Sequence, residues 1–242
     1  MSTEKSIIKG ISFFSDGLNL KGCLHLPSAN RPPVVIGSHG LYSSSNSPKQ
    51  IALADQCSRL GIAFFRFDHR GCGSSEGKFE EVTSLEARCR DLIDAVAVIT
   101  GTTDTSDRFG LFGSSMGGTV CLSVADELGA HTVVTFAAPI RSRTLENGPP
   151  ISQDTNNPGI FLDARKRPFD ITGRLSEISN ILIFHGEADD VVPVSHAEEI
   201  YNLAKQPKKL IKQKQGDHPM SNVAHQENFI REASLWFKRR LA

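Results

Sequence analysis

One short stretch, residues 113–118 with the sequence Gly-Ser-Ser-Met-Gly-Gly, constrains the fold of this chain more than any other. It follows an apolar run at 108–112 that is typical of a buried strand, and it precedes a run at 119–125 that fits a buried helix. A strand, a sharp turn carrying G-x-S-x-G and then a helix form a nucleophile elbow, in which the serine hydroxyl is exposed above a sheet. The flanking glycines leave room for the strand and the helix to pass close together. The pattern predicts Ser115 as a nucleophile.

Apolar runs of strand length alternate with helical patterns along the rest of the chain. We expect strands at 7–14, 18–26, 34–37, 62–67, 108–112, 133–137, 181–184 and 209–214. We expect helices at 48–60, 119–125 and 195–204, a helix that follows the capping box of Thr83 and Glu86, and a last helix with a buried stripe over 229–237. This alternation predicts an α/β fold in which right-handed crossovers connect the strands of a parallel sheet.

Local signals mark three of the boundaries. The Asp-Gly dipeptide at 16–17 separates the first two strands, which predicts a tight hairpin. Ser47 stands before a proline, which is a typical helix start. Ser195 and Glu198 form a second capping box at the start of the helix expected there.

The composition is that of an ordinary globular protein. The 242 residues are 39% hydrophobic and 22% charged, and this length suits one large domain that buries about 70–75% of its unfolded surface. Twenty-seven basic residues balance 27 acidic ones, so the charge gives no reason to expect a nucleic acid or an anionic membrane as partner. No run of about 18 apolar residues occurs, and we therefore expect no membrane span.

The cysteines and the first residues indicate a compartment. The chain has five cysteines, an odd number, and no C-x-x-C pair, which favours free thiols in a reducing cytoplasm. Residues 1–5 lack the apolar segment of a signal peptide. We expect a cytoplasmic protein that needs no cofactor and no metal. Whether it forms a homo-oligomer is left open by the sequence.

Polar residues with useful chemistry follow five of the predicted strands. They are His39, Asp68, Ser115, Asp189 and His218. Ligands of parallel sheets bind beyond the carboxyl ends of the strands, so we expect these side chains to share one rim. A serine needs a base to take its proton, and the base needs a partner that fixes its tautomer. We assign His218 as the base and Asp189 as its partner, with Asp190 and Asp217 as weaker alternatives.

The other histidines receive less specific assignments. His25 and His131 lie in or beside strands and are expected to be structural, whereas His69 lies in a polar loop with no evident task. His185 is expected to make a turn contact. His196 and His225, at or within helices, are expected to face solvent.

An oxyanion that forms on attack by Ser115 needs hydrogen-bond donors. In an elbow the backbone N–H of the residue after the nucleophile is one donor, here that of Met116. The second is expected from the loop after an earlier strand, and Leu41, which follows His39-Gly40, is the natural choice. Both donors are backbone groups, so the side chains at 41 and 116 matter little for this role.

Taken together, these motifs resemble those of the α/β-hydrolases over essentially the whole chain. The resemblance rests on the order Ser…Asp…His, on His39-Gly40, on Asp68-x-Arg70-Gly71-x-Gly73-x-Ser75 and on His185-Gly186-x-x-Asp189-x-x-Val192-Pro193. It implies a mostly parallel eight-stranded sheet with helices on both faces, in a single domain spanning 1–242 with a short lid. It also implies the triad Ser115, Asp189 and His218, the oxyanion donors Leu41 and Met116, and a structural role for Arg70.

Within this family the chain looks most like small bacterial esterases, including cinnamoyl and feruloyl esterases. It departs from many relatives at Ser114, where they carry histidine, and it lacks the triple-glycine oxyanion loop of one lipase branch. The resemblance implies cleavage of small-molecule carboxylic esters through an acyl-enzyme. A thioesterase or acyl-peptide hydrolase is the alternative enzyme, and a non-catalytic receptor with this fold is the alternative outside catalysis.

One long connection, at about 140–178, has four prolines and little periodicity. A connection of this length is usually functional. We expect it to form the lid and the acyl pocket, with Phe161 and Phe169 binding substrate. His39 and Gly40 are expected to contribute to substrate binding from the opposite loop.

Overall fold

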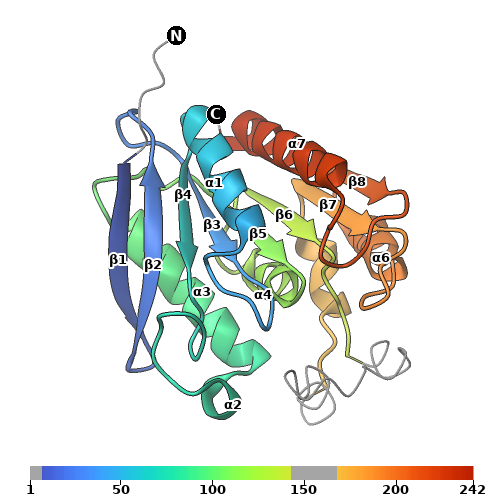
Figure 1. Ribbon diagram of the computed structural model, residues 1–242, viewed down its shortest axis with the longest axis horizontal. Helices are drawn as coiled ribbons and strands as arrows, with labels where there is room; N and C mark the ends of the chain where they lie inside the picture. The colour runs from blue at the N-terminus through green and yellow to red at the C-terminus, as the bar shows by residue number, and fades with distance from the viewer. Residues whose placement is uncertain (1–6, 143–167, 242) are drawn as a thin grey trace.

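The computed structural model describes residues 7–142 and 168–241. Eight strands form one sheet in the order β1-β2-β4-β3-β5-β6-β7-β8 (Figure 1). The strands are β1 (Ile7–Ser15), β2 (Leu18–Leu26), β3 (Val34–Ser38), β4 (Ala63–Phe67), β5 (Phe109–Ser114), β6 (Thr132–Phe136), β7 (Ile181–Gly186) and β8 (Lys208–Gln213). Only β2 runs against its neighbours, so the expected mostly parallel eight-stranded sheet is confirmed.

The first two strands form the hairpin that the Asp-Gly dipeptide predicts. They pair antiparallel from Ile7 with Leu26 to Ser15 with Leu18. Asp16 and Gly17 both have positive φ, at 46° and 81°. A two-residue loop of this kind matches the right-handed twist of the strands.

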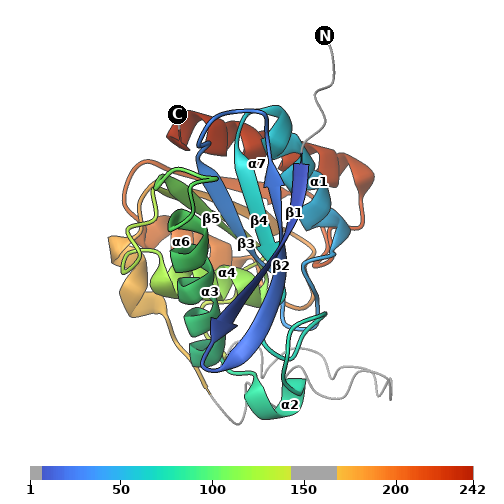
Figure 2. The ribbon, with the colours of Figure 1, turned by 90° about the vertical axis from the view of Figure 1, so that its left-hand side faces the viewer.

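The helices cover both faces of the sheet, as Figures 1 and 2 show. One face carries α1 (Pro48–Arg59) and α7 (Val223–Leu241), and the other carries α3 (Leu85–Thr100), α4 (Met116–Val124) and α6 (Ser195–Leu203). Two short elements, α2 (Phe79–Val82) and the 3₁₀ helix η1 (Thr172–Glu177), were not predicted. The last helix, α7, begins at Val223, before the buried stripe that the sequence predicts. The stripe does not reveal this start because residues 223–228 are not buried.

The core lies in two layers because the strands alternate between the two faces. Val34 and Ile36 of β3 pack with the residues of α3 and α4, whereas Val35 between them packs with α1 and α7. Phe64 and Phe65 of β4 divide in the same way. Strands buried on both sides read as continuous apolar runs, which is why the sequence shows them clearly.

The helix caps confirm one expectation and correct two. The Ser47 side chain accepts a hydrogen bond from the Gln50 N–H at 3.3 Å, as a cap of α1. The cap of α3 is Ser84, whose hydroxyl accepts from the Ala87 N–H at 3.1 Å, and not Thr83, which ends α2. The predicted box at Ser195 is also wrong, because α6 is preceded by Val194 and has no side-chain cap.

Part of the long connection belongs to the core. Ile140, Ile171 and Leu175 are buried beneath the sheet face that carries α3, and Phe169 packs against the same cluster while half-buried. Residues 143–167, with Phe161 among them, lie outside the described residues. The lid therefore stays a prediction, as does the division of the chain into one domain with an insertion.

A buried polar network joins α3 to the loop after β4. Asp91 on α3 accepts hydrogen bonds from Arg70 Nε at 2.8 Å and from the Arg70 backbone N–H at 3.0 Å, and it lies 3.2 Å from His69 Nδ1. Burial alone would raise the pKa of Asp91, but the contacts with His69 and Arg70 outweigh it and hold this pKa at about 2. The loop is thereby fixed to the helix by a carboxylate that stays charged.

This depressed pKa makes a testable contribution to stability. Because the folded-state pKa of about 2 lies below the ordinary value of 3.8, the contribution is fully present above about pH 4 and is lost as the pH falls through the folded value. We expect Asp91→Asn to reduce the free energy of unfolding near neutral pH by about 2 kcal/mol or more. The gap in this free energy between wild type and variant is expected to narrow toward pH 2.5. Urea unfolding of both proteins across this range measures it. Asp94→Asn, on the same helix outside the network, is the control, and a gap that stays constant with pH would contradict the assignment.

Candidate active site

Ser115 lies in a strained turn between β5 and α4. Its φ of 52° and ψ of −125° form a backbone conformation that a residue with a side chain rarely adopts. The turn is tied to the neighbouring strand, because the Ser115 N–H donates to the Phe136 carbonyl at 2.7 Å. The serine stays half-exposed at the end of the sheet, as an elbow requires.

Two glycines allow the elbow to close. A Cβ at Gly113 would collide with the carbonyl group of Gly117, the second residue of α4. A Cβ at Gly117 would collide with the carbonyl oxygens of Ser38, which ends β3, and of His39 after it. Only hydrogen fits at either position, so β5, α4 and the loop after β3 meet at one point.

The structure brings the three predicted side chains into a continuous chain of hydrogen bonds. His218 Nε2 lies 3.1 Å from Ser115 Oγ, and His218 Nδ1 lies 2.8 Å from Asp189 Oδ2. The carboxylate of Asp189 is wholly buried, whereas the imidazole of His218 is 19% exposed. The three residues follow β5, β7 and β8, which end at the same edge of the sheet.

Asp189 is held by more than His218. Its Oδ1 accepts hydrogen bonds from the backbone N–H groups of Val191 at 2.9 Å and Val192 at 2.7 Å. His185 Nε2 lies 3.4 Å from Oδ2 and 2.7 Å from the Val192 carbonyl, which is the expected turn contact. Burial alone would raise the pKa of Asp189, but the hydrogen bonds from His185 and His218 outweigh it and hold this pKa well below its usual range.

The two alternative acids lie in other environments. Asp190 is exposed, and its side chain takes no part in the contacts of His218. The Asp217 side chain accepts from the backbone N–H of Ser221 at 2.7 Å and so shapes its own loop. Of the three carboxylates, the structure brings only Asp189 to the imidazole.

The two predicted oxyanion donors lie on either side of the elbow. Met116 is the first residue of α4, and the Gly40–Leu41 loop lies so close that a Cβ at Gly40 would be 3.6 Å from the Ser115 Cβ. Within residues 7–142 and 168–241, neither the Leu41 N–H nor the Met116 N–H donates to a protein acceptor. In this part of the chain both N–H groups are thus free of protein acceptors, and their role as oxyanion donors stays a prediction.

His39 differs from its predicted role. It is buried, and its Nδ1 contacts the Gly40 carbonyl at 2.7 Å while its Nε2 accepts from the His69 N–H at 3.1 Å. The imidazole has no free nitrogen for a substrate, contrary to the substrate-binding role expected for it. Gly40 lies against the elbow, whereas Phe169 packs against the core.

The structure gives His69 a role that the sequence did not indicate, and it contradicts the assignment of His196. His69 is wholly buried, with Nε2 at 2.8 Å from Ser38 Oγ and Nδ1 beside Asp91. Burial lowers its pKa to about 4. His196 is also buried rather than solvent-facing, and its Nδ1 accepts from the Ile140 N–H at 3.0 Å. The partners of His69 and of His196 lie 22 or more residues away in the chain, so the local sequence could not indicate these contacts.

Three charged residues near the site were not predicted from the sequence. The Lys49 ammonium lies 3.8 Å from the centre of the Phe136 ring, and burial lowers the pKa of Lys49 to about 8 despite the attraction of Asp217 and Asp189. Arg88 and Asp91 are buried on α3, on the same face as Leu92. Charges at helical spacing on an apolar stripe are the signal that could have identified these last two.

Neither a metal site nor a membrane span is found in the part of the chain that the structure describes. No group of three histidine, cysteine, aspartate or glutamate side chains gathers there in a way that could hold a metal ion. No helix there is both long enough and apolar enough to cross a bilayer.

Comparison with known proteins adds three findings. The family described as serine aminopeptidase, S33, matches residues 29–156. The uncharacterized protein YfhR of Escherichia coli K12 is 30% identical over 212 residues, which cover 84% of this chain and 70% of YfhR. The mitochondrial palmitoyl-protein thioesterase ABHD10 of Mus musculus is 25% identical over 218 residues, which cover 80% of this chain and 71% of ABHD10.

Among solved structures, the chain is similar to Est1E of Butyrivibrio proteoclasticus with ferulic acid bound. The TM-score is 0.81 at 18% identity, and the match covers 95% of this chain and 98% of Est1E. This likeness confirms the fold expected from the sequence, that of an α/β-hydrolase with one mostly parallel sheet.

The close approach at the elbow predicts that Gly117→Ala destabilises the protein. The added methyl group must displace the backbone after β3, which we expect to lower the free energy of unfolding by about 1–3 kcal/mol. Thermal or urea unfolding measures the change. Gly10→Ala is the matched control, because a Cβ at that exposed position meets nothing within 4 Å. Equal stabilities of the two variants would contradict the packing described here.

Proposed function

The chain belongs to the serine aminopeptidase S33 family of α/β-hydrolases, and on that premise we propose that it cleaves carboxylic esters through an acyl-enzyme. Ser115 is the nucleophile, His218 the general base and Asp189 the residue that orients the base. The observation that carries the proposal is the continuous hydrogen-bond chain from Ser115 through His218 to Asp189. A receptor with this fold would not need all three groups in contact.

The reaction follows from the positions of the three side chains. Ser115 Oγ attacks the ester carbonyl carbon while His218 Nε2 takes the hydroxyl proton. The tetrahedral intermediate collapses, the bond to the alcohol oxygen breaks, and His218 returns the proton to that oxygen. Water then attacks the acyl-enzyme with His218 again as base, which releases the acid and restores Ser115.

Asp189 sets the tautomer of His218. Its Oδ2 accepts from Nδ1–H, which leaves Nε2 unprotonated and directed at Ser115. Because its pKa is depressed, the carboxylate stays charged at neutral pH and stabilises the imidazolium that forms during attack.

We propose that two backbone donors, the N–H groups of Leu41 and Met116, stabilise the negative charge of the tetrahedral intermediate. Met116 begins α4, where the helix N-terminus adds a favourable dipole. Donors of this kind act without reorganisation at the moment of reaction.

For the substrate we propose only a chemical class and the part of the chain that binds it. We assign the part of the segment 140–178 that does not join the core, with Phe161, to the lid and the acyl pocket. The free state of all five cysteines supports a cytoplasmic location. The name of ABHD10 favours thioesters as the second candidate substrates, with acyl-peptides less favoured, and the ferulic acid bound to Est1E favours hydroxycinnamate esters. Turnover of p-nitrophenyl esters, hydroxycinnamate esters and acyl-thioesters by one preparation separates these classes.

The nucleophile is tested by covalent labelling. We expect a fluorophosphonate probe to modify Ser115 and Ser115→Ala to abolish the labelling. Ser114→Ala, which changes the neighbouring hydroxyl, is expected to keep it. Intact-mass spectrometry and peptide mapping give the readout. Label that persists in Ser115→Ala would remove Ser115 from the role.

The orienting acid is tested by a matched pair of neighbours. We expect Asp189→Asn to lower kcat by up to about 10⁴-fold, because the amide favours the wrong tautomer of His218. Asp190→Asn makes the same chemical change at an exposed position and is expected to keep kcat within about twofold. Steady-state kinetics on the best ester of the panel measures both. Comparable losses in the two variants would show that the acid is misassigned.

A further inference from the structure

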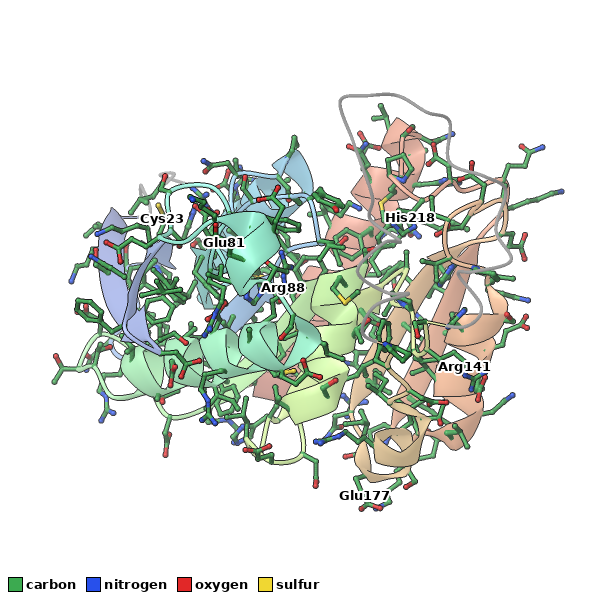
Figure 3. All side chains as sticks on the ribbon, turned by 90° about the horizontal axis from the view of Figure 1, so that it is seen from below. Cys23, Glu81, Arg88, Arg141, Glu177 and His218 are labelled. Carbon is green, nitrogen blue, oxygen red and sulfur yellow. The ribbon has the colours of Figure 1, made fainter. Side chains whose placement is uncertain are left out.

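Arg88 is the largest fully buried side chain among the described residues. It belongs to α3, and Figure 3 shows it directed into the interior of the molecule. Within residues 7–142 and 168–241 its guanidinium forms no ion pair, since nearby Asp91 is bonded to Arg70 and His69. Burial lowers the pKa of Arg88, yet arginine remains protonated in proteins. An unpaired buried charge is costly and therefore calls for a specific task.

The guanidinium is directed at one short loop. Nη1 donates to the carbonyl oxygens of His39 and Gly40, both at 3.3 Å, and Nη2 donates to the Leu41 carbonyl at 2.8 Å. Nη2 also contacts Cys72 Sγ at 3.3 Å. One side chain thus holds three consecutive carbonyl groups of the loop that follows β3.

His39 adds a second donor to the same loop. The His69 N–H donates to His39 Nε2, so that nitrogen carries no proton and Nδ1–H donates to the Gly40 carbonyl at 2.7 Å. Burial lowers the pKa of His39 well below its usual value, which favours this neutral form. The Gly40 carbonyl therefore accepts from His39 and Arg88, and also from the Ser43 N–H at 3.3 Å.

These contacts fix the direction of a backbone donor. A trans peptide is planar, and its C=O and N–H point in opposite directions. The carbonyl of Gly40 shares its peptide plane with the N–H of Leu41, so donors that hold the carbonyl on one side aim the N–H to the other. The Leu41 carbonyl is held as well, which fixes the peptide planes on both sides of Leu41.

We propose that Arg88 is the positioning residue of the oxyanion site, which aims the Leu41 N–H at the developing negative charge and places a positive charge behind that peptide. The inference rests on the proposed function. The guanidinium polarises the Gly40 carbonyl and so strengthens the Leu41 N–H as a donor. Arg88 acts through the backbone and touches no reacting atom.

The test compares Arg88→Met and Arg88→Lys with wild type. We expect Arg88→Met to lower kcat by about 10–100-fold, less than the loss of a whole oxyanion donor, with KM changed by less than about threefold. Arg88→Lys keeps the positive charge but loses the planar, forked set of N–H donors. Its kcat is expected to lie between those of Arg88→Met and wild type. The pH dependence of kcat/KM is expected to match that of wild type, because the contacts of His218 with Ser115 and Asp189 are unchanged.

A transition-state analogue gives a readout that a merely structural role would not move. Ser115 Oγ adds to the carbonyl carbon of an aryl trifluoromethyl ketone, its proton passes to His218, and the ketone oxygen becomes an oxyanion. We expect the Ki of this ketone to rise in Arg88→Met by the same factor by which kcat/KM falls. The Ki of the product acid, which forms no such oxyanion, is expected to change by less than about threefold.

Arg66→Met is the matched control. Arg66 is a second buried arginine, bonded to His25, the Ser45 carbonyl and Asn46 rather than to the carbonyls of 39–41. We expect Arg66→Met to lower the Tm of the protein while its kcat stays within about threefold of wild type. If Arg88→Met does not fold, Arg88→Lys carries the comparison.

The outcomes separate the two proposals. Arg88 variants that are less stable but keep wild-type kcat and ketone affinity would overturn the positioning role and leave the proposed function intact. Ester turnover that is the same in wild type and Ser115→Ala would overturn the proposed function, and the assignment of Arg88 would fall with it. A parallel loss of kcat/KM and ketone affinity, with Arg66→Met active, supports the inference.

Discussion

The close approach of backbone at the elbow is the constraint on which the rest of the site depends. A side chain at Gly113 or Gly117 would collide with backbone carbonyls, so α4 can start directly against β5 and against the loop after β3. The same approach forces Ser115 into its positive φ and leaves its hydroxyl free of the helix. The tightly packed neighbours over-determine this strained backbone, which is why the turn can persist.

Around the elbow, buried polar groups do what apolar packing cannot. Hydrophobic contact fixes the distance between two elements but leaves the direction of a loop carbonyl free, whereas a hydrogen bond sets that direction. Asp91 fixes the loop after β4 through Arg70, and Arg88 holds the loop after β3 by its carbonyls. Both charges come from α3, so one helix sets two loops of the rim.

The electrostatic arrangement of the site has two separate parts. On one side, the buried carboxylate of Asp189 faces the imidazole of His218. On the other, α4 begins beside Ser115, and the cation of Arg88 lies behind the loop after β3. In the proposed reaction, attack by Ser115 would create a positive and a negative charge together, and each would meet a group of opposite sign that is fixed before substrate arrives.

The element order, the mostly parallel sheet and the three side chains that meet at its edge could all be predicted from the amino-acid sequence. Strands buried on both faces give continuous apolar runs, and parallel strands place the residues after them on one rim, so local pattern sufficed. The folded structure alone shows that His69 and His196 are buried and that Arg88 holds the loop at 39–41. Those facts depend on partners tens of residues away, and a hydrogen bond between distant segments leaves no periodic signal in the chain.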